Sequence, residues 1–234
     1  MIDFVAAFRA ALALILGADP TLWGIIALSL AVSLSAVALA SLVGLPLGAA
    51  VALYRFRGRW LLIVALNAAM GLPPVVVGLV LYLLLSRAGP LGSFGILFTP
   101  SAMVLAQAVL VAPIIAALAR QTVEDLWGEL GEQLRSLGVG ATRAIPTLLW
   151  EGRFSLLMAV LAGFGRAIAE VGAVIIVGGN IAGVTRTMTT AIALETSKGD
   201  LALALGLGLI LIGLSASINA AAFLMGQAAR ARIA

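Results

Sequence analysis

The chain has 234 residues, of which 63% are hydrophobic and only 10% are charged, and its formal net charge is +4. A soluble domain of this length needs more polar surface, so the composition excludes an ordinary soluble protein and indicates an integral membrane protein. Cysteine and histidine are absent from the sequence, which excludes disulfides, thiolate chemistry and imidazole metal ligands. The basic residues form no continuous stripe, so no nucleic-acid partner is expected.

Five apolar segments are candidates for transmembrane helices. They cover residues 22–53, 60–86, 99–119, 154–178 and 201–225. Each has about the 20 residues that a helix needs to cross a bilayer, and none alternates as the strands of a barrel do. We therefore predict an all-α membrane protein with about five transmembrane helices within residues 21–227.

The N-terminal residues 1–20 differ from these spans. Phe4 to Leu16 is apolar over 13 positions and is interrupted by Arg9. This run is short for a span and has no basic residues before it, so we expect a helix lying in the membrane interface and not a cleaved signal peptide. A sixth crossing remains the alternative.

The basic residues predict the orientation of the chain. Residues 55–59, 120–153 and the tail 228–234 hold nine Lys and Arg, whereas the loops of the other side hold four. Because loops rich in Lys and Arg remain inside, the 120–153 loop and the C-terminus are predicted to be cytoplasmic and the N-terminus external.

The 120–153 loop is the longest polar interruption, with nine of the 24 charged residues. Within it, Glu132 to Gly138 is predicted as a short helical stretch ended by a glycine. A compact helix of mixed charge on a membrane protein suits contact with a soluble partner.

Polar groups and prolines within the spans are candidates for a path or a gate. Arg166 and Glu170 are four residues apart, which places them on one face of a helix. Isolated charges are costly at membrane depth, so this pair either neutralises itself or serves function. Pro73 and Pro74 predict a kink, and kinked helices often line a path. Asn180 follows a glycine-rich exit, which is either an ordinary loop or a contact for substrate.

Motifs for catalysis and cofactors are absent. The sequence contains no phosphate-binding Gly-x-x-x-x-Gly-Lys loop and no Gly-x-Ser-x-Gly elbow. Its carboxylates are scattered or matched with arginine. We expect no catalytic, cofactor or metal site, and hence no enzyme activity of this chain itself.

Several motifs resemble one family. Glu132 and Gly138, with Gln133 and Leu134 in place of two alanines, resemble the cytoplasmic coupling motif of ATP-binding-cassette importer permeases. The resemblance is incomplete, because Trp150-Glu151 stands where the motif has Leu-Pro. The segments 70–78, 165–173 and 179–181 are similar to permeases for molybdate, tungstate and sulfate, and 171–198 is most similar to the tungstate type.

The resemblance implies the transmembrane domain of a type I importer in a bacterial or archaeal cytoplasmic membrane. It further implies two cytoplasmic ATPase subunits, which hydrolyse ATP, and an external oxyanion-binding protein. Glu132, Gln133, Leu134 and Gly138 would contact the ATPase. Five spans alone make a poor conduit, so a homodimer surrounded by membrane lipid is expected. The implied substrate is tungstate first, with molybdate or sulfate next.

A weak passage, with affinity left to the binding protein, would avoid trapping the anion. We hypothesise that it is lined by small, hydroxyl and amide groups, including Asn67, Gln107 and Asn180. Pro73, Pro74, Arg166 and Glu170 are the candidates for its gate. The main alternative is a secondary transporter or channel that needs no ATPase, although no inverted repeat is visible. A membrane-embedded enzyme and a purely structural subunit are further alternatives.

Overall fold

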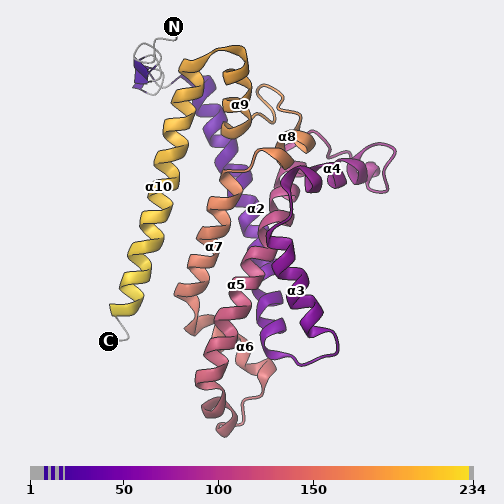
Figure 1. The fold of residues 1–234 in the computed structure, drawn as a ribbon, viewed down its shortest axis with the longest axis vertical. Coiled ribbons are helices and arrows are strands. Elements are labelled where there is room, and N and C mark those ends of the chain that lie inside the picture. The colour runs from indigo at the N-terminus through magenta and orange to yellow at the C-terminus, as the bar shows by residue number, and fades with distance from the viewer. Residues whose placement is uncertain (1–7, 10–11, 14–15, 18, 232–234) are drawn as a thin grey trace. The chain divides into compact units, whose positions relative to one another are not determined.

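The computed structural model describes residues 8–9, 12–13, 16–17 and 19–231 (Figure 1). The helices, in chain order, are α2 (Pro20–Leu53), α3 (Arg59–Met70), α4 (Pro74–Leu85), the 3₁₀ helix η1 (Gly92–Phe94), α5 (Pro100–Ser136), α6 (Ala141–Glu151), α7 (Arg153–Ile168), α8 (Gly172–Gly178), α9 (Met188–Lys198) and α10 (Leu201–Ala231). No strand occurs in this part of the chain, which confirms the all-α prediction. The interfacial helix predicted for residues 1–20 lies largely outside the described residues. The predicted tail 228–234 begins within α10.

The chain forms two compact units. The first contains the described residues up to Ala36 together with Pro73–Gln107 and Ala167–Ile218. The second contains Val37–Leu72, Ala108–Arg166 and the described residues from Asn219 onward. Four helices, α2, α5, α7 and α10, are divided between the units, whereas each of the others belongs to one of them.

Three described helices are long and apolar enough to cross a membrane by themselves. They are α2, α5 and the Leu201–Ile218 part of α10, and the number rises to five if the pairs α3–α4 and α6–α7 each count as one broken span. The predicted number of about five is thus the upper value.

Two predicted spans are not continuous helices. Residues 60–86 are interrupted between Met70 and Pro74, where Pro73 precedes α4 and Pro74 is its first residue. Proline fixes its own φ and restricts the residue before it, so the helix restarts at this point. Residues 154–178 are interrupted between α7 and α8 for a different reason, which lies in the side chains around Glu170.

Close helix packing in the second unit depends on glycine. A Cβ on Gly48 would lie 2.8 Å from Ala119 Cβ and 2.9 Å from the backbone nitrogen of Arg120, and a Cβ on Gly44 would lie 3.1 Å from the carbonyl oxygen of Ala112. The Gly44-x-x-x-Gly48 face of α2 therefore contacts the backbone of α5. This is the association by small residues that lipid favours, since apolar burial alone does not drive helices together there.

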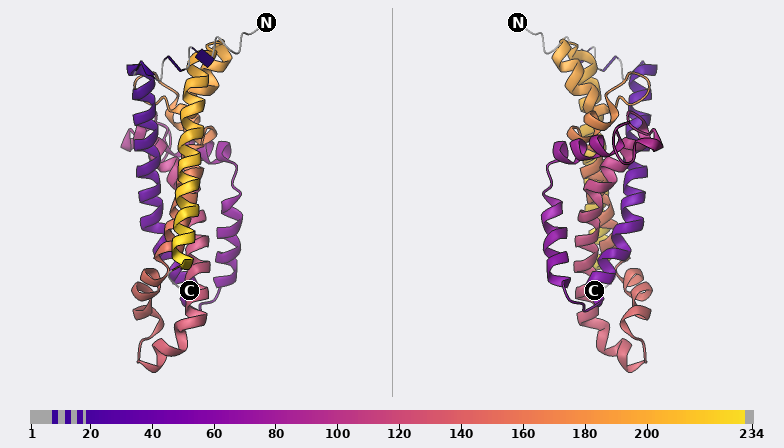
Figure 2. Two further views of the ribbon diagram at one scale, coloured as in Figure 1. Left: turned by 90° about the vertical axis from the view of Figure 1, so that its left-hand side faces the viewer. Right: turned by 90° about the vertical axis from the view of Figure 1, so that its right-hand side faces the viewer.

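The polar 120–153 segment is mostly helical and not an open loop. It consists of the C-terminal part of α5 and the whole of α6, and these form a helical hairpin at one end of the second unit (Figure 2). A small apolar cluster holds the hairpin on the end of α2; its buried members are Ala49, Leu53, Val123, Ala144 and Leu148.

Arg59 further fixes the end of α2. Its Nε donates to the carbonyl oxygen of Val51 at 2.8 Å, and its Nη2 lies 3.0 Å from Glu124 Oε1. Glu124 also pairs with Arg120 one turn earlier on α5. Arg59 thus satisfies a helix-end carbonyl and links α2 to α5.

In the first unit α4 lies against α8 (Figure 1). A Cβ on Gly78 would lie 2.8 Å from Ala173 Cα, and one on Gly172 would lie 2.8 Å from Val75 Cγ2. These two glycines allow the short helix α8 to approach α4 closely.

The glycine contact of α2 predicts a stability difference between two Gly→Ala changes. Gly48→Ala should lower the free energy of unfolding by about 1–3 kcal/mol, because the added methyl group meets the α5 backbone. Gly128→Ala is the matched control: it lies within α5, a methyl group added to it would meet nothing within 4 Å, and the change should raise stability by about 0.4–1 kcal/mol. Thermal unfolding in detergent measures both, and equal midpoints for the two variants would contradict this packing.

Candidate functional site

Two regions concentrate the polar chemistry of the chain. The first is the α5–α6 hairpin tip in the second unit, residues 132–140. The second is a buried polar network in the first unit, which holds the break between α7 and α8.

The hairpin tip is a helix end with a defined stop. Glu132 to Ser136 are the last residues of α5, and Gly138 follows with φ 75°. The N–H of Gly138 donates to Arg135 O at 3.0 Å and the N–H of Val139 donates to Leu134 O at 2.8 Å. This hydrogen-bond pair is the Schellman stop, in which a glycine takes the left-handed conformation. The predicted glycine stop is confirmed, but the stretch before it is the end of a long helix and not a separate short one.

The side chains of the hairpin tip divide into an inner and an outer face. Leu134 and Val139 pack on the apolar cluster beneath the hairpin. Glu132 and Gln133 are exposed, and Leu137 is 77% exposed at the turn. A surface leucine flanked by exposed polar side chains on a packed support is suited to contact another protein.

The first unit contains all the buried polar residues of the described part of the chain. They are Ser29, Ser33, Gln107, Glu170, Thr185, Thr187, Thr189, Thr190 and Glu195, each less than 9% exposed. Polar groups at such depth are stable only when they are hydrogen-bonded, so their partners reveal what the network does.

The network satisfies the backbone where α7 stops. Gln107 Nε2 donates to Ala167 O at 3.0 Å, close to the end of α7. The Glu170 carboxylate accepts the N–H of Ala173 at 3.1 Å, which caps the first turn of α8. Thr189 Oγ1 on α9 donates to Glu170 O at 2.7 Å. Glu170 and Thr189 thus take up backbone groups that the interrupted helix leaves without partners. Gln107 adds a second donor to Ala167 O, which also accepts the N–H of Glu170.

The start of α9 is fixed to α2 by the same kind of contact. Thr187 and Thr190 form a capping box at the N-terminus of α9. The N–H of Met188 donates to Ser29 Oγ on α2 at 2.7 Å, and this hydroxyl donates to Ile25 O at 2.8 Å. Ser29 is therefore the link between α2 and α9.

The segment between α8 and α9 is irregular. Gly179 has φ 72° and Asn180 has φ 51°, a left-handed conformation that asparagine tolerates better than most residues. Asn180 Nδ2 donates to Thr190 O at 3.4 Å, while its Oδ1 is buried without a partner in the described structure. Thr185 Oγ1 donates to Gly178 O at 2.6 Å and accepts the N–H of Ile181.

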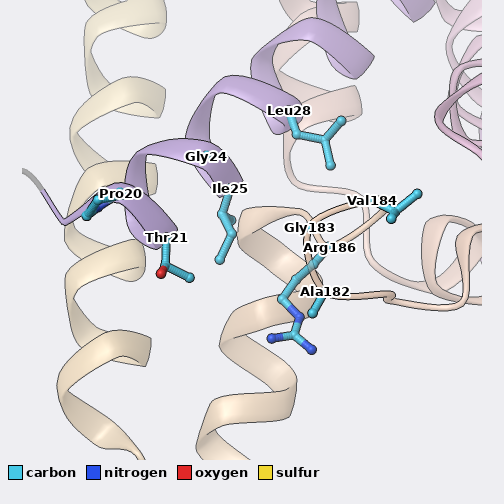
Figure 3. A pocket seen from close by; sticks show the side chains of 9 residues that line it. All are labelled: Pro20, Thr21, Gly24, Ile25, Leu28, Ala182, Gly183, Val184 and Arg186. Atoms are coloured by element: carbon cyan, nitrogen blue, oxygen red, sulfur yellow. The ribbon is translucent and has the colours of Figure 1, made fainter.

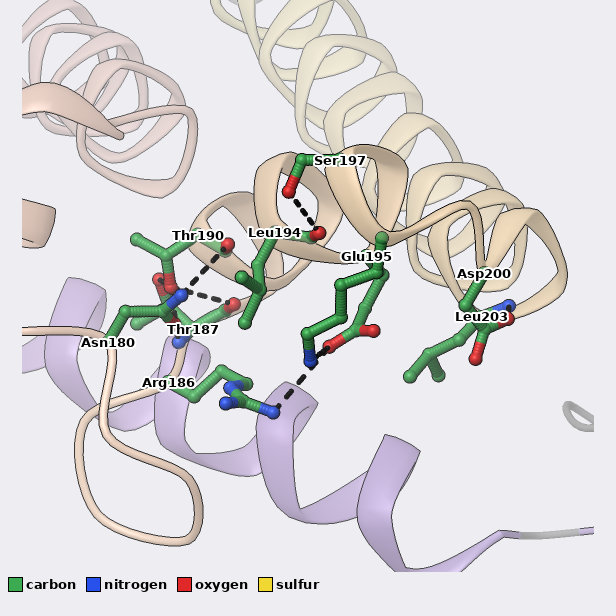
Figure 4. Close-up of polar contacts among 10 residues, drawn as sticks. Asn180, Arg186, Thr187, Thr190, Leu194, Glu195, Ser197, Asp200 and Leu203 are labelled. Atoms are coloured by element: carbon green, nitrogen blue, oxygen red, sulfur yellow. Dashed lines mark hydrogen bonds and ion pairs between the residues drawn. The ribbon is translucent and has the colours of Figure 1, made fainter.

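A buried carboxylate completes the region. Glu195 is 5% exposed; its Oε1 lies 3.0 Å from Lys198 Nζ and 3.6 Å from Arg186 Nη1 (Figure 4). These ionic contacts connect α9 to the irregular segment before it.

No family model matches the chain. The tungstate uptake system permease protein TupB of Peptoclostridium acidaminophilum is 42% identical over 213 residues, which cover 91% of this chain and 93% of that protein. A probable anion ABC transporter permease protein of Haloferax volcanii is 42% identical over 201 residues, covering 84% and 87% respectively. The molybdenum transport system permease protein ModB of Escherichia coli is 35% identical, covering 78% and 83%.

The chain belongs to the ABC transporter permease family. A permease subunit of this kind is not itself an enzyme. Among the described residues, no group of three or more acidic side chains is placed to hold a metal ion.

The structure brings together some of the candidate gate and path residues of the permease. Gln107, Glu170 and Asn180 all lie in the first unit, within or beside the buried network. Asn67 is exposed on α3 in the second unit, whereas Pro73 precedes α4 and Pro74 is the first residue of that helix.

The prediction that Arg166 and Glu170 lie in one helix is wrong. α7 ends at Ile168, and Glu170 lies in the break before α8. At this break the side chains of Glu170 and Thr189 each take up one backbone group, the N–H of Ala173 and the carbonyl oxygen of Glu170 respectively.

Sequence reasoning missed most of the threonines of the network. A signal was present, because Thr185, Thr187, Thr189 and Thr190 form a dense run of hydroxyls beside an apolar segment. Ser29 gave no such signal, since it is one of several serines in a long apolar helix.

The contact between α2 and α9 predicts unequal effects of two serine substitutions on α2. Ser29→Ala should destabilise the permease by about 1–3 kcal/mol, because the buried N–H of Met188 loses its acceptor. Ser41→Ala is the control, since Ser41 Oγ is buried without a hydrogen-bond partner and its removal should be neutral or stabilising. Thermal unfolding and protease resistance of the purified variants measure the difference. Equal stability of the two variants would show that Ser29 does not carry the contact.

Proposed function

We propose that the permease forms the translocation path of an ATP-driven importer for tungstate. The observation that carries this choice is the 42% identity with the tungstate permease of Peptoclostridium acidaminophilum over nearly the whole length of both chains. The molybdenum permease of Escherichia coli is 35% identical, and the sulfate permease CysW of Synechococcus elongatus is 30% identical over 73% of this chain. Molybdate and sulfate are therefore the next candidates.

The active assembly contains two copies of the permease, two cytoplasmic ATPase subunits and an external oxyanion-binding protein. Three to five possible crossings per chain support the requirement for a second copy, because so few helices enclose a path poorly. The C-terminus and the α5–α6 hairpin face the cytoplasm, in agreement with their basic residues.

The α5–α6 hairpin tip transmits movement between the ATPase and the path. Its exposed residues Glu132, Gln133 and Leu137 form the contact, with Leu134 and Gly138 fixing the shape of the tip. The support for this role is mechanical. The tip ends a single long helix, and a packed apolar cluster prevents it from bending freely.

The break between α7 and α8 is the gate region. Glu170 holds α8 and α9 through two hydrogen bonds, and Gln107 holds the end of α7. Side-chain bonds can be exchanged at lower cost than a continuous helix can be broken. Arg166, Pro73 and Pro74 belong to the same mechanism, with Asn67 and Asn180 as polar groups along the path.

The coupling contact predicts the effect of reversing one charge. Glu132→Arg should reduce recovery of the ATPase with the purified permease and should lower uptake by roughly tenfold. The reason is that the new arginine either meets a positive charge of the ATPase or has no partner in the contact. Asp125→Arg reverses an exposed charge on the same helix outside the motif and should leave both quantities near wild type. Co-purification and uptake of tungstate measure the outcome. Wild-type association and uptake in Glu132→Arg would refute the coupling role.

The choice of anion predicts selective stimulation of ATP hydrolysis. The reconstituted permease–ATPase complex should respond several-fold more strongly to binding protein loaded with tungstate than to the same protein without anion. Binding proteins loaded with molybdate or sulfate serve as matched comparisons. A response to one of these alone would reassign the substrate, and no response to any would refute the importer.

A further inference from the structure

A cavity of about 400 Å³ lies in the first unit between the first turns of α2 and the irregular segment before α9 (Figure 3). We call it the Arg186 pocket. Its lining residues are Pro20, Thr21, Gly24, Ile25, Leu28, Ala182, Gly183, Val184 and Arg186. Arg186 is the one charged residue in this lining, and most of its neighbours are apolar.

The guanidinium of Arg186 is poorly satisfied for a charge at this depth. Its side chain is 19% exposed, and its one ion pair with a described residue is the 3.6 Å contact between Nη1 and Glu195 Oε1. That distance is too long for a hydrogen bond. No residue that the structure describes accepts a hydrogen bond from the guanidinium, and Nε is fully buried without a partner. Arginine carries five N–H donors, and the four on the two Nη atoms are the ones that a ligand can reach, because Nε is closed off.

The three charged side chains that meet at Glu195 carry a net positive charge. Glu195 is shared by Arg186 and Lys198, which leaves one positive charge in excess in this group of three. Asp19 at the start of α2 uses its Oδ1 to accept the N–H groups of Thr21 and Leu22. Asp19 thus caps α2 and keeps its negative charge beside the pocket lining.

We propose that the Arg186 pocket binds a tetrahedral oxyanion through the guanidinium of Arg186. Planar, forked N–H groups suit two oxygens of such an anion, and an anion would neutralise the excess charge. Its identity as the transported substrate rests on the proposed function. The same chemistry would suit the phosphate of a lipid headgroup, so the experiment has to separate these two sources.

The pocket has room for this ligand. Its volume is many times the roughly 30 Å³ of a water molecule. Methyl groups added to Gly24 and Gly183 would meet nothing within 4 Å, so both backbones border open space. Gly24 is within α2, where a larger side chain fits without strain in the backbone. This glycine therefore offers a way to fill the pocket while keeping Arg186.

The test is direct binding of tungstate to the purified permease–ATPase complex in phosphatidylcholine nanodiscs, without any binding protein. Bound tungsten is counted after equilibrium dialysis. Wild type should bind tungstate saturably, in competition with sulfate. Arg186→Gln and Gly24→Leu should each weaken binding by roughly tenfold or more, the first by removing the charge and the second by occupying the space.

Arg87→Gln is the matched control, because it removes an exposed arginine of the same unit that does not line the Arg186 pocket. It should bind tungstate as wild type does. Folding of each variant is checked by its thermal unfolding midpoint and by recovery of the ATPase. Gly24→Leu keeps the test decisive if Arg186→Gln proves unstable.

Nanodiscs of a phosphate-free glycolipid identify the source of the anion. One outcome is that wild type binds more tungstate in the glycolipid nanodiscs and less when phosphatidylglycerol is added, while Arg186→Gln shows neither change. The pocket is then an oxyanion site occupied by a lipid headgroup. If lipid has no effect, free tungstate is the ligand. Absence of Arg186-dependent binding of either probe, or equal binding by wild type and both pocket variants, would overturn the proposal.

The binding experiment and the ATPase stimulation experiment can fail separately. If tungstate does not bind in the Arg186 pocket, stimulation of ATP hydrolysis by the loaded binding protein would still be evidence for the importer. Conversely, a complex could bind tungstate at Arg186 while no loaded binding protein stimulates its ATP hydrolysis. That result would support the binding site and refute the proposed importer function.

Discussion

The structure depends on one constraint: backbone groups freed by breaking a helix at membrane depth must find partners within the protein. Water is not available there, and each unsatisfied group costs several kcal/mol by order of magnitude. Between α7 and α8 the partners include the side chains of Glu170 and Thr189, and Gln107 adds a second donor to Ala167 O, which also accepts the N–H of Glu170. Three of the buried polar residues of the first unit contact this break.

The helices within each unit are held together by a different kind of contact. In the second unit, Gly44 and Gly48 let α2 contact the α5 backbone, so that close van der Waals packing does the work. In the first unit, Ser29 and the threonines connect α2, α8 and α9 by hydrogen bonds. Packing of this close kind resists change, whereas hydrogen bonds between side chain and backbone can be exchanged. The first unit is therefore the better suited to gating.

The proposed mechanism thus combines a stiff element with an adaptable one. The α5–α6 hairpin tip is a helix end stopped by Gly138 and supported by an apolar cluster, which suits force transfer. The Arg186 pocket and the α7–α8 break suit weak, reversible contacts. Such contacts fit a conduit, because an anion that is bound too tightly would not be released.

The sequence by itself determined the all-α membrane class, the family and the glycine stop at Gly138. These follow from the length of the apolar runs and from motifs whose residues are neighbours in the sequence. Only the tertiary structure decided that residues 154–178 break after Ile168 and that Ser29 of α2 supports the start of α9. Apolar composition cannot reveal such a break, because the residues that make it possible, Gln107 and Thr189, lie far from it in the chain. Hydrogen-bond partners that are distant in sequence become visible only when the helices are packed.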